Sequence, residues 1–420
     1  MHVRFANKKL LVLGGKPIGS CEIVEYAKKE GAYVIVADYL PKEFSAAKRL
    51  ADECWDISTG DTDEIEKLIL ANNIDAVYTG VHEFNISKML QICKDLNLPC
   101  YCTPEQWDNV DNKESFKNMC RKYGIPVTKE YALSSQFSEE ELNKIEYPVI
   151  IKPVDGSGSR GFSICRDRSE LLNYYPKAVE YSPSGTVLVE QYMNYENSVI
   201  INYTLVDGKV IYSGIGDKKS KKISETGAPI MSAVIYPSLY EKAYLEELDS
   251  KVRKMFTEEG YSNGVIWIEA FSDNGKFTFN ELGYRFGGSL TYHAVKHIMG
   301  FDQLALQVEY ALTGGNESIS CDYVAPGDVY MVLPVHVKPG KISRIEGINE
   351  IKNRKEFNEI VYVHFVGDQI EDWGSAQQVF AYVHFITSDR EEADIFAKYI
   401  VNTLKVYDEE DNQMLFNLYV

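Results

Sequence analysis

Val149-Ile150-Ile151-Lys152-Pro153 runs directly into Val154-Asp155-Gly156-Ser157-Gly158-Ser159-Arg160-Gly161. The apolar run predicts a buried strand that ends at a lysine, and the three glycines predict a loop whose backbone can closely approach a ligand. Backbone amides and hydroxyls at Ser157, Gly158 and Ser159 can donate to phosphate oxygens, and Lys152 adds a positive point charge. A surface hairpin is the alternative, which a lysine in a buried strand disfavours. The stretch therefore predicts a nucleotide-phosphate loop.

Downstream of this loop, two apolar runs each contain one glutamate, Glu269 and Glu281, with Asp273-Asn274-Gly275 as a hairpin turn between them. Charged residues are rare in such strands unless they are paired or bind a metal. A three-residue loop would place the two glutamates on one face as a magnesium site, whereas a two-residue Asn-Gly turn would separate them. Two edge-strand carboxylates facing water are the alternative.

A third loop, Arg285-Phe286-Gly287-Gly288-Ser289, follows the acidic hairpin. A guanidinium can bind a carboxylate or phosphate through two parallel hydrogen bonds, and Gly287 and Gly288 let the backbone approach a small anion. We therefore expect Arg285 to bind an anionic group, with a buried salt bridge to a hairpin carboxylate as the alternative.

The first hundred residues alternate between strand and helix patterns, which predicts a parallel sheet with helices on both faces. Gly14 and Gly15 follow the first strand and Asp38 ends the second. The glycine spacing does not fit a dinucleotide fingerprint, because Leu13 replaces its first glycine. It does not fit a P-loop either, because Ser20-Cys21 replaces the Lys-Ser/Thr pair. Glu83, after a later strand, is a candidate for binding a substrate amino group, or else a helix-start carboxylate.

The length of 420 residues predicts two to four domains. The net charge of −18 disfavours nucleic-acid binding, because nucleic acid repels a negative surface. No apolar run reaches membrane-spanning length and no signal-peptide pattern is present, so we expect a cytoplasmic protein. The eight scattered cysteines fit a reduced compartment. The basic cluster Lys218, Lys219, Lys221 and Lys222 is either a solvated loop or a phosphate-facing one, and His293 and His297 are helix-surface or substrate-pocket residues rather than zinc ligands.

The ordered set of a lysine-terminated strand, a glycine loop, Leu188-Val189-Glu190-Gln191-Tyr192-Met193, an acidic hairpin and Arg-x-Gly-Gly resembles the ATP-grasp superfamily. The resemblance implies a Rossmann-like parallel-sheet domain over residues 1–108, an ATP-grasp domain of two α+β subdomains over 109–320, and a C-terminal β-rich domain over 321–420. Within the central domain, ATP would lie between the two subdomains.

Carried over by motif, the resemblance implies a role for each matching residue. Lys113 and Lys152 would bind ATP phosphates, and Arg285 the acyl phosphate or substrate carboxylate. Residues Glu190, Gln191, Tyr192 and Met193 match the hinge that binds adenine, and Glu196 matches the ribose-binding glutamate. Glu269 and Glu281 match the magnesium carboxylates. This sequence departs from many members at Gly283, where an asparagine would be an additional metal ligand, and at Asn194-Tyr195-Glu196 in the hinge.

The function implied by the resemblance is ATP-dependent ligation: a small carboxylate is activated as an acyl phosphate and coupled to an amine, with Mg²⁺ or Mn²⁺ and release of ADP. The partners would be small-molecule acid and amine substrates, without nucleic acid or membrane, and a homodimer is left open. A carbamoyl-phosphate-synthetase-like or purine-biosynthesis ligase that uses bicarbonate or formate is the second hypothesis. A dinucleotide-binding oxidoreductase and a catalytically silent nucleotide-binding regulator are the others.

Overall fold

The computed structural model describes residues 4–15, 19–133, 137–154, 161–194, 198–222, 229–316, 323, 325–371 and 378–419. Within these ranges, no helix is long and apolar enough to cross a membrane. Helices and strands are both abundant, and they form one parallel sheet at the N-terminus and a large antiparallel sheet that begins in the middle of the chain.

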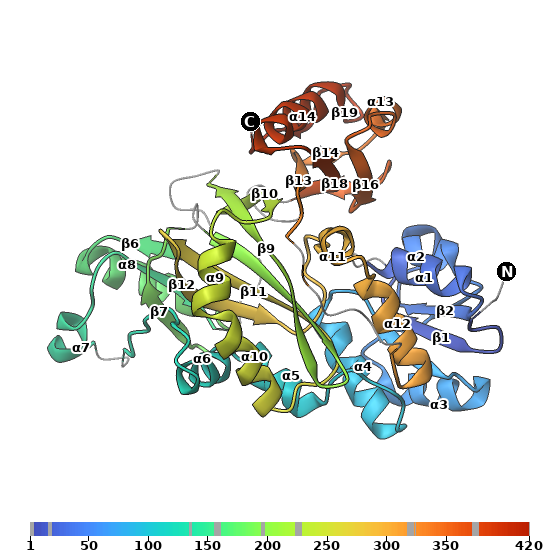
Figure 1. The fold of residues 1–420 in the computed structure, drawn as a ribbon, viewed down its shortest axis with the longest axis horizontal. Helices are drawn as coiled ribbons and strands as arrows, with labels where there is room; N and C mark the ends of the chain where they lie inside the picture. Colours follow the sequence, from blue (N-terminus) through green and yellow to red (C-terminus); the bar gives the residue numbers. More distant parts are fainter. Residues whose placement is uncertain are drawn as a thin grey trace.

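The N-terminal part is a four-stranded parallel sheet in the order β3-β2-β1-β4. Figure 1 shows α1 and α2 on one side of it and α3 and α4 on the other. Residues Leu10 to Leu13 of β1 are fully buried, as a central parallel strand requires. The elements are β1 (Lys9–Leu13), α1 (Ser20–Lys29), β2 (Tyr33–Asp38), η1 (Lys42–Phe44), α2 (Ala46–Leu50), β3 (Glu53–Asp56), α3 (Thr62–Asn72), β4 (Ala76–Thr79) and α4 (Glu83–Asp95). The predicted strand–helix alternation is confirmed.

A small antiparallel sheet, in the order β6-β5-β7, carries the lysine-terminated strand. Its own core is covered by α8, which packs on all three strands. Helices α5 and α6 connect the N-terminal part to this sheet. The bounds are α5 (Pro104–Asp111), α6 (Lys113–Lys122), α7 (Glu139–Asn143), β5 (Val149–Pro153), β6 (Ser163–Cys165), α8 (Arg168–Glu180) and β7 (Val187–Gln191).

A nine-stranded sheet forms the rest of the core, in the order β12-β11-β8-β9-β10-β13-β18-β16, with β20 also paired to β13. Its strands are β8 (Ser198–Val206), β9 (Lys209–Lys221), β10 (Ile230–Tyr236), β11 (Gly264–Asp273), β12 (Lys276–Gly283), β13 (Val329–Val337), β16 (Phe357–Tyr362), β18 (Val379–Thr387) and β20 (Leu415–Phe416). Because β10 pairs with β13, strands from the middle and from the end of the chain share one sheet.

Most of the remaining elements flank this sheet, whereas the helix Gln303–Thr313 packs on the N-terminal part (Figure 1). Two helices follow β10 and meet at Leu248. The described C-terminal part has a long helix, α14, and a shorter one, α13. The bounds are α9 (Glu241–Glu247), α10 (Asp249–Glu258), α11 (Tyr292–Met299), α12 (Gln303–Thr313), β14 (Gly340–Lys341), β15 (Arg344–Glu346), α13 (Ile348–Lys352), β17 (Gln369–Ile370), α14 (Arg390–Thr403) and β19 (Lys405–Tyr407).

The acidic hairpin combines a two-residue turn with a β-bulge. The turn between β11 and β12 has two residues, Asn274 and Gly275, and both have positive φ, as a type I′ turn requires. Of the two turns that the sequence left open, the two-residue one is therefore formed, and it would by itself separate the two glutamates. However, a β-bulge leaves Asn280 without a partner and shifts the register by one residue, so that Glu269 lies directly opposite Glu281. The bulge brings the two glutamates to one face.

Candidate active site

Helix α6 presents two lysines to the region between the two antiparallel sheets. Asn112 caps the helix by accepting a hydrogen bond from the backbone N–H of Ser115, which fixes Lys113 at its first position. Lys117 follows four residues later, so both side chains lie on one helix face. A lysine at a helix N-terminus opposes the helix dipole, which indicates that Lys113 is placed there to meet an anion.

Lys117 was not predicted as a site residue, yet it is the most buried cation of the site. Its side chain has no exposed surface, and its ammonium group donates to the carboxylates of Glu130 and Glu190. Glu190 also pairs with Lys152 from the neighbouring strand β5. Burial raises the pKa of Glu190, but the charges of Lys152 and Lys117 outweigh burial and hold that pKa below its ordinary value. Glu190 is therefore an ionised anchor between two lysines.

Lys113 has no ion pair with any residue in the described part of the chain. Burial lowers its pKa, and the nearby charge of Lys152 lowers it further, against the opposite effects of Glu281 and Glu190. An anionic group bound between Lys113 and Lys152 would relieve this repulsion. The two lysines that were predicted to bind ATP phosphates thus lie near each other. Lys152 is paired with Glu190, whereas Lys113 has no ion pair within the described residues and can bind an anion.

The glutamates of the hairpin lie on the other side of this charged cluster. Glu269 is buried and accepts a hydrogen bond from Lys218. Burial raises the pKa of Glu281, and the charge of Glu269 adds to the rise, while Lys113, Lys218 and Lys152 oppose it. Two carboxylates that repel each other on one face are a hard-oxygen donor set, which fits Mg²⁺.

Lys218 belongs to β9, and so do Lys219 and Lys221, so the basic cluster is part of a strand and the expectation of a loop is wrong. Strand β9 pairs with β8, and β8 pairs with β11, which brings Lys218 to Glu269 across 51 residues of sequence. Sequence spacing contains no signal for such a pair, because it depends on the order of three strands.

Arg285 and Glu83, both predicted to contact substrate, form an ion pair with each other at 2.6 Å. The Arg285 guanidinium also lies over the Trp267 ring, 5.3 Å from its centroid, and donates to the carbonyl oxygen of Phe286. Glu83 begins α4 at the carboxyl end of β4. The arginine therefore pairs with the N-terminal domain, and the alternative of a salt bridge to a hairpin carboxylate is wrong.

The remaining predicted residues are placed unequally. Gln191 ends β7, and the backbone N–H of Tyr192, next to Met193, donates to the carbonyl oxygen of Pro148. Gly287 and Gly288 lie in the loop between Arg285 and α11. Four predicted nucleotide-binding residues lie outside the described residues: Ser157, Gly158, Ser159 and Glu196.

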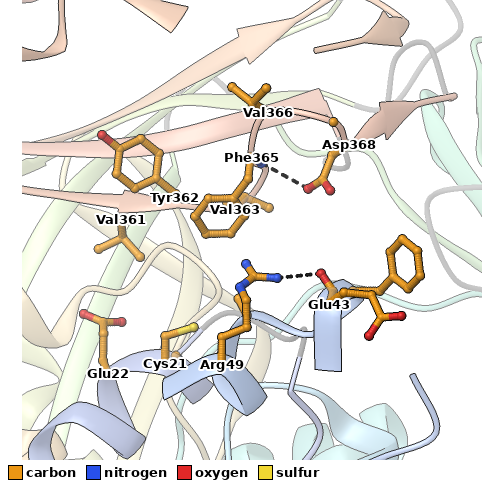
Figure 2. A pocket seen from close by; sticks show the side chains of 14 residues that line it. Cys21, Glu22, Glu43, Arg49, Val361, Tyr362, Val363, Phe365, Val366 and Asp368 are labelled. Atoms are coloured by element: carbon orange, nitrogen blue, oxygen red, sulfur yellow. Dashed lines mark hydrogen bonds between the residues drawn. The ribbon is translucent and has the colours of Figure 1, made fainter. Parts of the chain in front are cut away.

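A cleft of about 240 Å³ lies between helices α1 and α2 and the C-terminal segment 361–368 (Figure 2). Arg49 extends from α2 toward the ring of Phe365, 5.9 Å away, and donates to the carbonyl oxygen of Glu43. Glu22 and Asp368 add carboxylates to the lining. The cleft can therefore hold a small polar molecule at the junction of the first and last parts of the chain.

Helix α11, which follows the Arg285 loop, contacts Glu22, one of the residues that line this cleft. His293 lies 2.7 Å from Glu22, and Tyr292 donates to the same carboxylate. His297, one turn later, lies 2.9 Å from Asp328. Both histidines have carboxylate partners, and the described residues hold no group of three or more His, Cys, Asp or Glu side chains that could bind a metal. The pair Glu22–His293 links the loop of Arg285 to the N-terminal domain.

The site can now be compared with known proteins. The family described as "Carbamoyl-phosphate synthase L chain, ATP binding domain" matches residues 112–209. The solved L-amino acid ligase from Bacillus licheniformis superposes with a TM-score of 0.76 at 20% identity, covering 96% of this chain and 99% of that one. The chain has the ATP-grasp fold. The residues matched by the family model include Lys113, Lys152 and Glu190.

Two further likenesses extend this result. A phosphoribosylamine–glycine ligase from Fusobacterium nucleatum is 23% identical over 336 residues, which are 76% of this chain and 78% of that protein. The biotin carboxylase domain of 2-oxoglutarate carboxylase from Hydrogenobacter thermophilus, solved with MgADP and bicarbonate, has a TM-score of 0.78 at 19% identity and covers 97% of this chain and 91% of that one. These likenesses confirm the predicted fold class, and the two superpositions cover almost the whole chain.

Proposed function

We propose that the chain is an ATP-dependent, ADP-forming ligase that activates a small carboxylate as an acyl phosphate and couples it to an amine, forming a C–N bond. The observation that carries the proposal is the convergence of Lys113 and Lys152 with Glu269 and Glu281. Cations for phosphate and carboxylates for a metal meet at one place from α6, β5 and the acidic hairpin. The proteins named in the comparisons act in reactions of this kind.

The residues present fit Mg-ATP, which when bound would supply the phosphoryl group and the metal charge. Lys113 and Lys152 would hold phosphate oxygens and offset the negative charge that develops during transfer. Glu269 and Glu281 would ligate the cation. Glu190 keeps Lys152 and Lys117 in place, and the hinge that it begins would face the adenine. Mn²⁺ is proposed as a substitute for Mg²⁺, since it accepts the same oxygen ligands.

We propose that the activated acid is an amino acid. Arg285, which is mostly buried, and Glu83, which is exposed, form an ion pair with their charged groups 2.6 Å apart. A zwitterion complements both: its carboxylate would bind the Arg285 guanidinium and its ammonium would bind Glu83. Gly287 and Gly288 would let the backbone approach the same carboxylate. Substrate binding would then replace the internal ion pair by two external ones.

A purine-type or carbamoyl-phosphate-type ligase, with bicarbonate or formate as the acid, is the second candidate. The matches to phosphoribosylamine–glycine ligase and to a formate-dependent phosphoribosylglycinamide formyltransferase favour it. The lining of the cleft in Figure 2 favours the amine ligase, because one guanidinium, that of Arg49, stands among three acidic residues, Glu22, Glu43 and Asp368, which suits an amine better than a phosphate ester. Measuring ADP release with each amino acid, bicarbonate and formate, each with and without amines, separates the two.

We further propose a cytoplasmic enzyme of small-molecule substrates, either monomeric or homodimeric, with domain boundaries near residues 108 and 320. Size-exclusion chromatography with light scattering measures the oligomeric state, and limited proteolysis locates the domain boundaries. Cleavage that clusters far from both boundaries would contradict the proposed division.

Mg-ATP is expected to raise the midpoint of thermal unfolding. A ligand that binds only the native state adds about 2.7 kcal/mol of stability at a hundredfold excess over its dissociation constant. Differential scanning fluorimetry with Mg-ATP, ATP alone and NADH gives the comparison. An unchanged midpoint with Mg-ATP, or an equal response to NADH, would remove the basis of the proposed function.

Arg285→Lys is expected to lower kcat/KM for the acid substrate by about a hundredfold, because a lost bidentate contact to a charged group costs about 2–3 kcal/mol. Nucleotide binding should change little, since Arg285 pairs with Glu83 and not with the carboxylates that hold Lys117 and Lys152. Calorimetric titration with an ATP analogue checks this. A weaker analogue affinity together with a lower unfolding midpoint would show that Arg285 has a structural role instead.

A further inference from the structure

Trp267 and Gly283 are direct cross-strand partners on the acidic hairpin, one residue pair beyond Ile268 and Leu282. The indole leans over the glycine: a Cβ atom added at Gly283 would lie 2.3 Å from Nε1 and 2.4 Å from Cε2 of Trp267. Such distances are far below van der Waals contact, so the ring occupies the space of a side chain at position 283. The same ring lies 3.6 Å, at Cδ1, from a Cβ built on Gly287.

The indole stands on the reactive face of the hairpin. Successive side chains of a strand alternate between faces, so Trp267 shares a face with Glu269, and position 283 shares a face with Glu281. The pairing is regular over these residues, because the bulge lies beyond Glu269 toward the turn. Trp267 is therefore the immediate neighbour of the two proposed metal ligands.

The indole offers chemistry opposite to that of an amide side chain. An asparagine at position 283 would present a carbonyl oxygen, which ligates cations, whereas the indole nitrogen is a donor only. Trp267 Nε1 is buried and has no hydrogen-bond partner among the described residues, and the same is true of Arg285 Nε. The positive end of an N–H dipole repels a cation and attracts an anionic oxygen. Trp267 also supports Arg285, whose guanidinium lies over its ring.

We propose that the Trp267 indole occupies the position of a third metal-ligating side chain, so that the hairpin binds one divalent cation per chain. The indole ring and its N–H group would then face the anionic substrate. Trp267 is then a positioning residue: it orients Arg285 through its ring and excludes a second cation through its N–H. The inference rests on the proposed function, because it takes Glu269 and Glu281 as metal ligands.

The first experiment tests whether the Trp267 ring fills the space of a side chain at position 283. Gly283→Ala is expected to lower the midpoint of thermal unfolding, because its Cβ meets the indole. The same substitution in a Trp267→Ala background should leave that midpoint unchanged. Gly288→Ala is the matched control, since a Cβ there has no atom within 4 Å. If Gly283→Ala is as stable as the parent, or if Trp267→Ala fails to relieve its effect, the assignment of the space to Trp267 is overturned.

The second experiment counts cations. Mn²⁺ is titrated into the full chain with an equimolar non-hydrolysable ATP analogue, and electron paramagnetic resonance of free Mn²⁺ gives the number bound. The parent should bind one Mn²⁺, and Trp267→Ala/Gly283→Asn should bind two. Two in the parent, or one in a folded double variant, overturns the inference. An analogue that fails to raise the unfolding midpoint of the parent would instead refute the proposed function, so the two failures are distinguishable.

Discussion

Glu281→Gln is expected to reduce ADP release by at least about a thousandfold, the equivalent of about 4 kcal/mol in the transition state. Glutamine keeps the size of the side chain but removes the charge that would ligate the cation. Stability should be unchanged or higher, because burial and the neighbouring Glu269 already raise the pKa of Glu281 and disfavour its charge. Turnover is measured by coupled ADP detection, and stability by chemical denaturation.

Asp273→Asn is the matched control for this variant. It removes one negative charge from the exposed end of the same hairpin, at the residue before the turn, and should leave ADP release unaltered. Near-parental activity of Glu281→Gln with a competent substrate would mean that the acidic hairpin is structural. Equal losses in both variants would point to a general effect of charge on the hairpin.

Lys117→Met is expected to destabilise the protein by about 3 kcal/mol, the typical cost of leaving a buried charge without its partner. The fully buried ammonium group contacts both Glu130 and Glu190, and methionine fills the space without neutralising either carboxylate. The free energy of unfolding in urea gives the magnitude. Lys122→Met on the same helix removes an exposed ion pair with Glu259 and should change stability little.

A second substitution separates charge from packing in this cluster. If the loss in Lys117→Met comes from uncompensated carboxylates, Glu190→Gln should recover part of it in the double variant, because one buried charge is then removed. If the double variant is less stable than Lys117→Met alone, the lysine stabilises the fold through its contacts and not through its charge.

Local patterns were sufficient for the parts of the site that depend on short stretches. The apolar run before Lys152 predicted its strand, and Asn274-Gly275 between apolar strands predicted the hairpin. The bulge at Asn280 was not predictable, because a bulge depends on how the two strands pack and not on turn chemistry. It decides the site all the same, since without it Glu269 and Glu281 would lie on opposite faces.

Contacts between distant residues were beyond reach of the sequence. Lys117 could have been suspected from its spacing of four from Lys113, which places both on one helix face. Its partner Glu190 is 73 residues away, and Arg285 is 202 residues from Glu83. Such pairs follow from the docking of whole elements, so the residue types were visible in the sequence while their pairing was not. The contact of Trp267 with Gly283 likewise depends on how β11 pairs with β12.

The pairing of β10 with β13 has a consequence for how the chain can be divided. Strand β10 reads Ile230-Met231-Ser232-Ala233-Val234-Ile235-Tyr236, an almost wholly apolar segment. A bare edge of this composition is a template for intermolecular strand addition. The C-terminal part therefore covers this edge as well as lining the cleft, and its removal near residue 320 would expose an aggregation-prone strand.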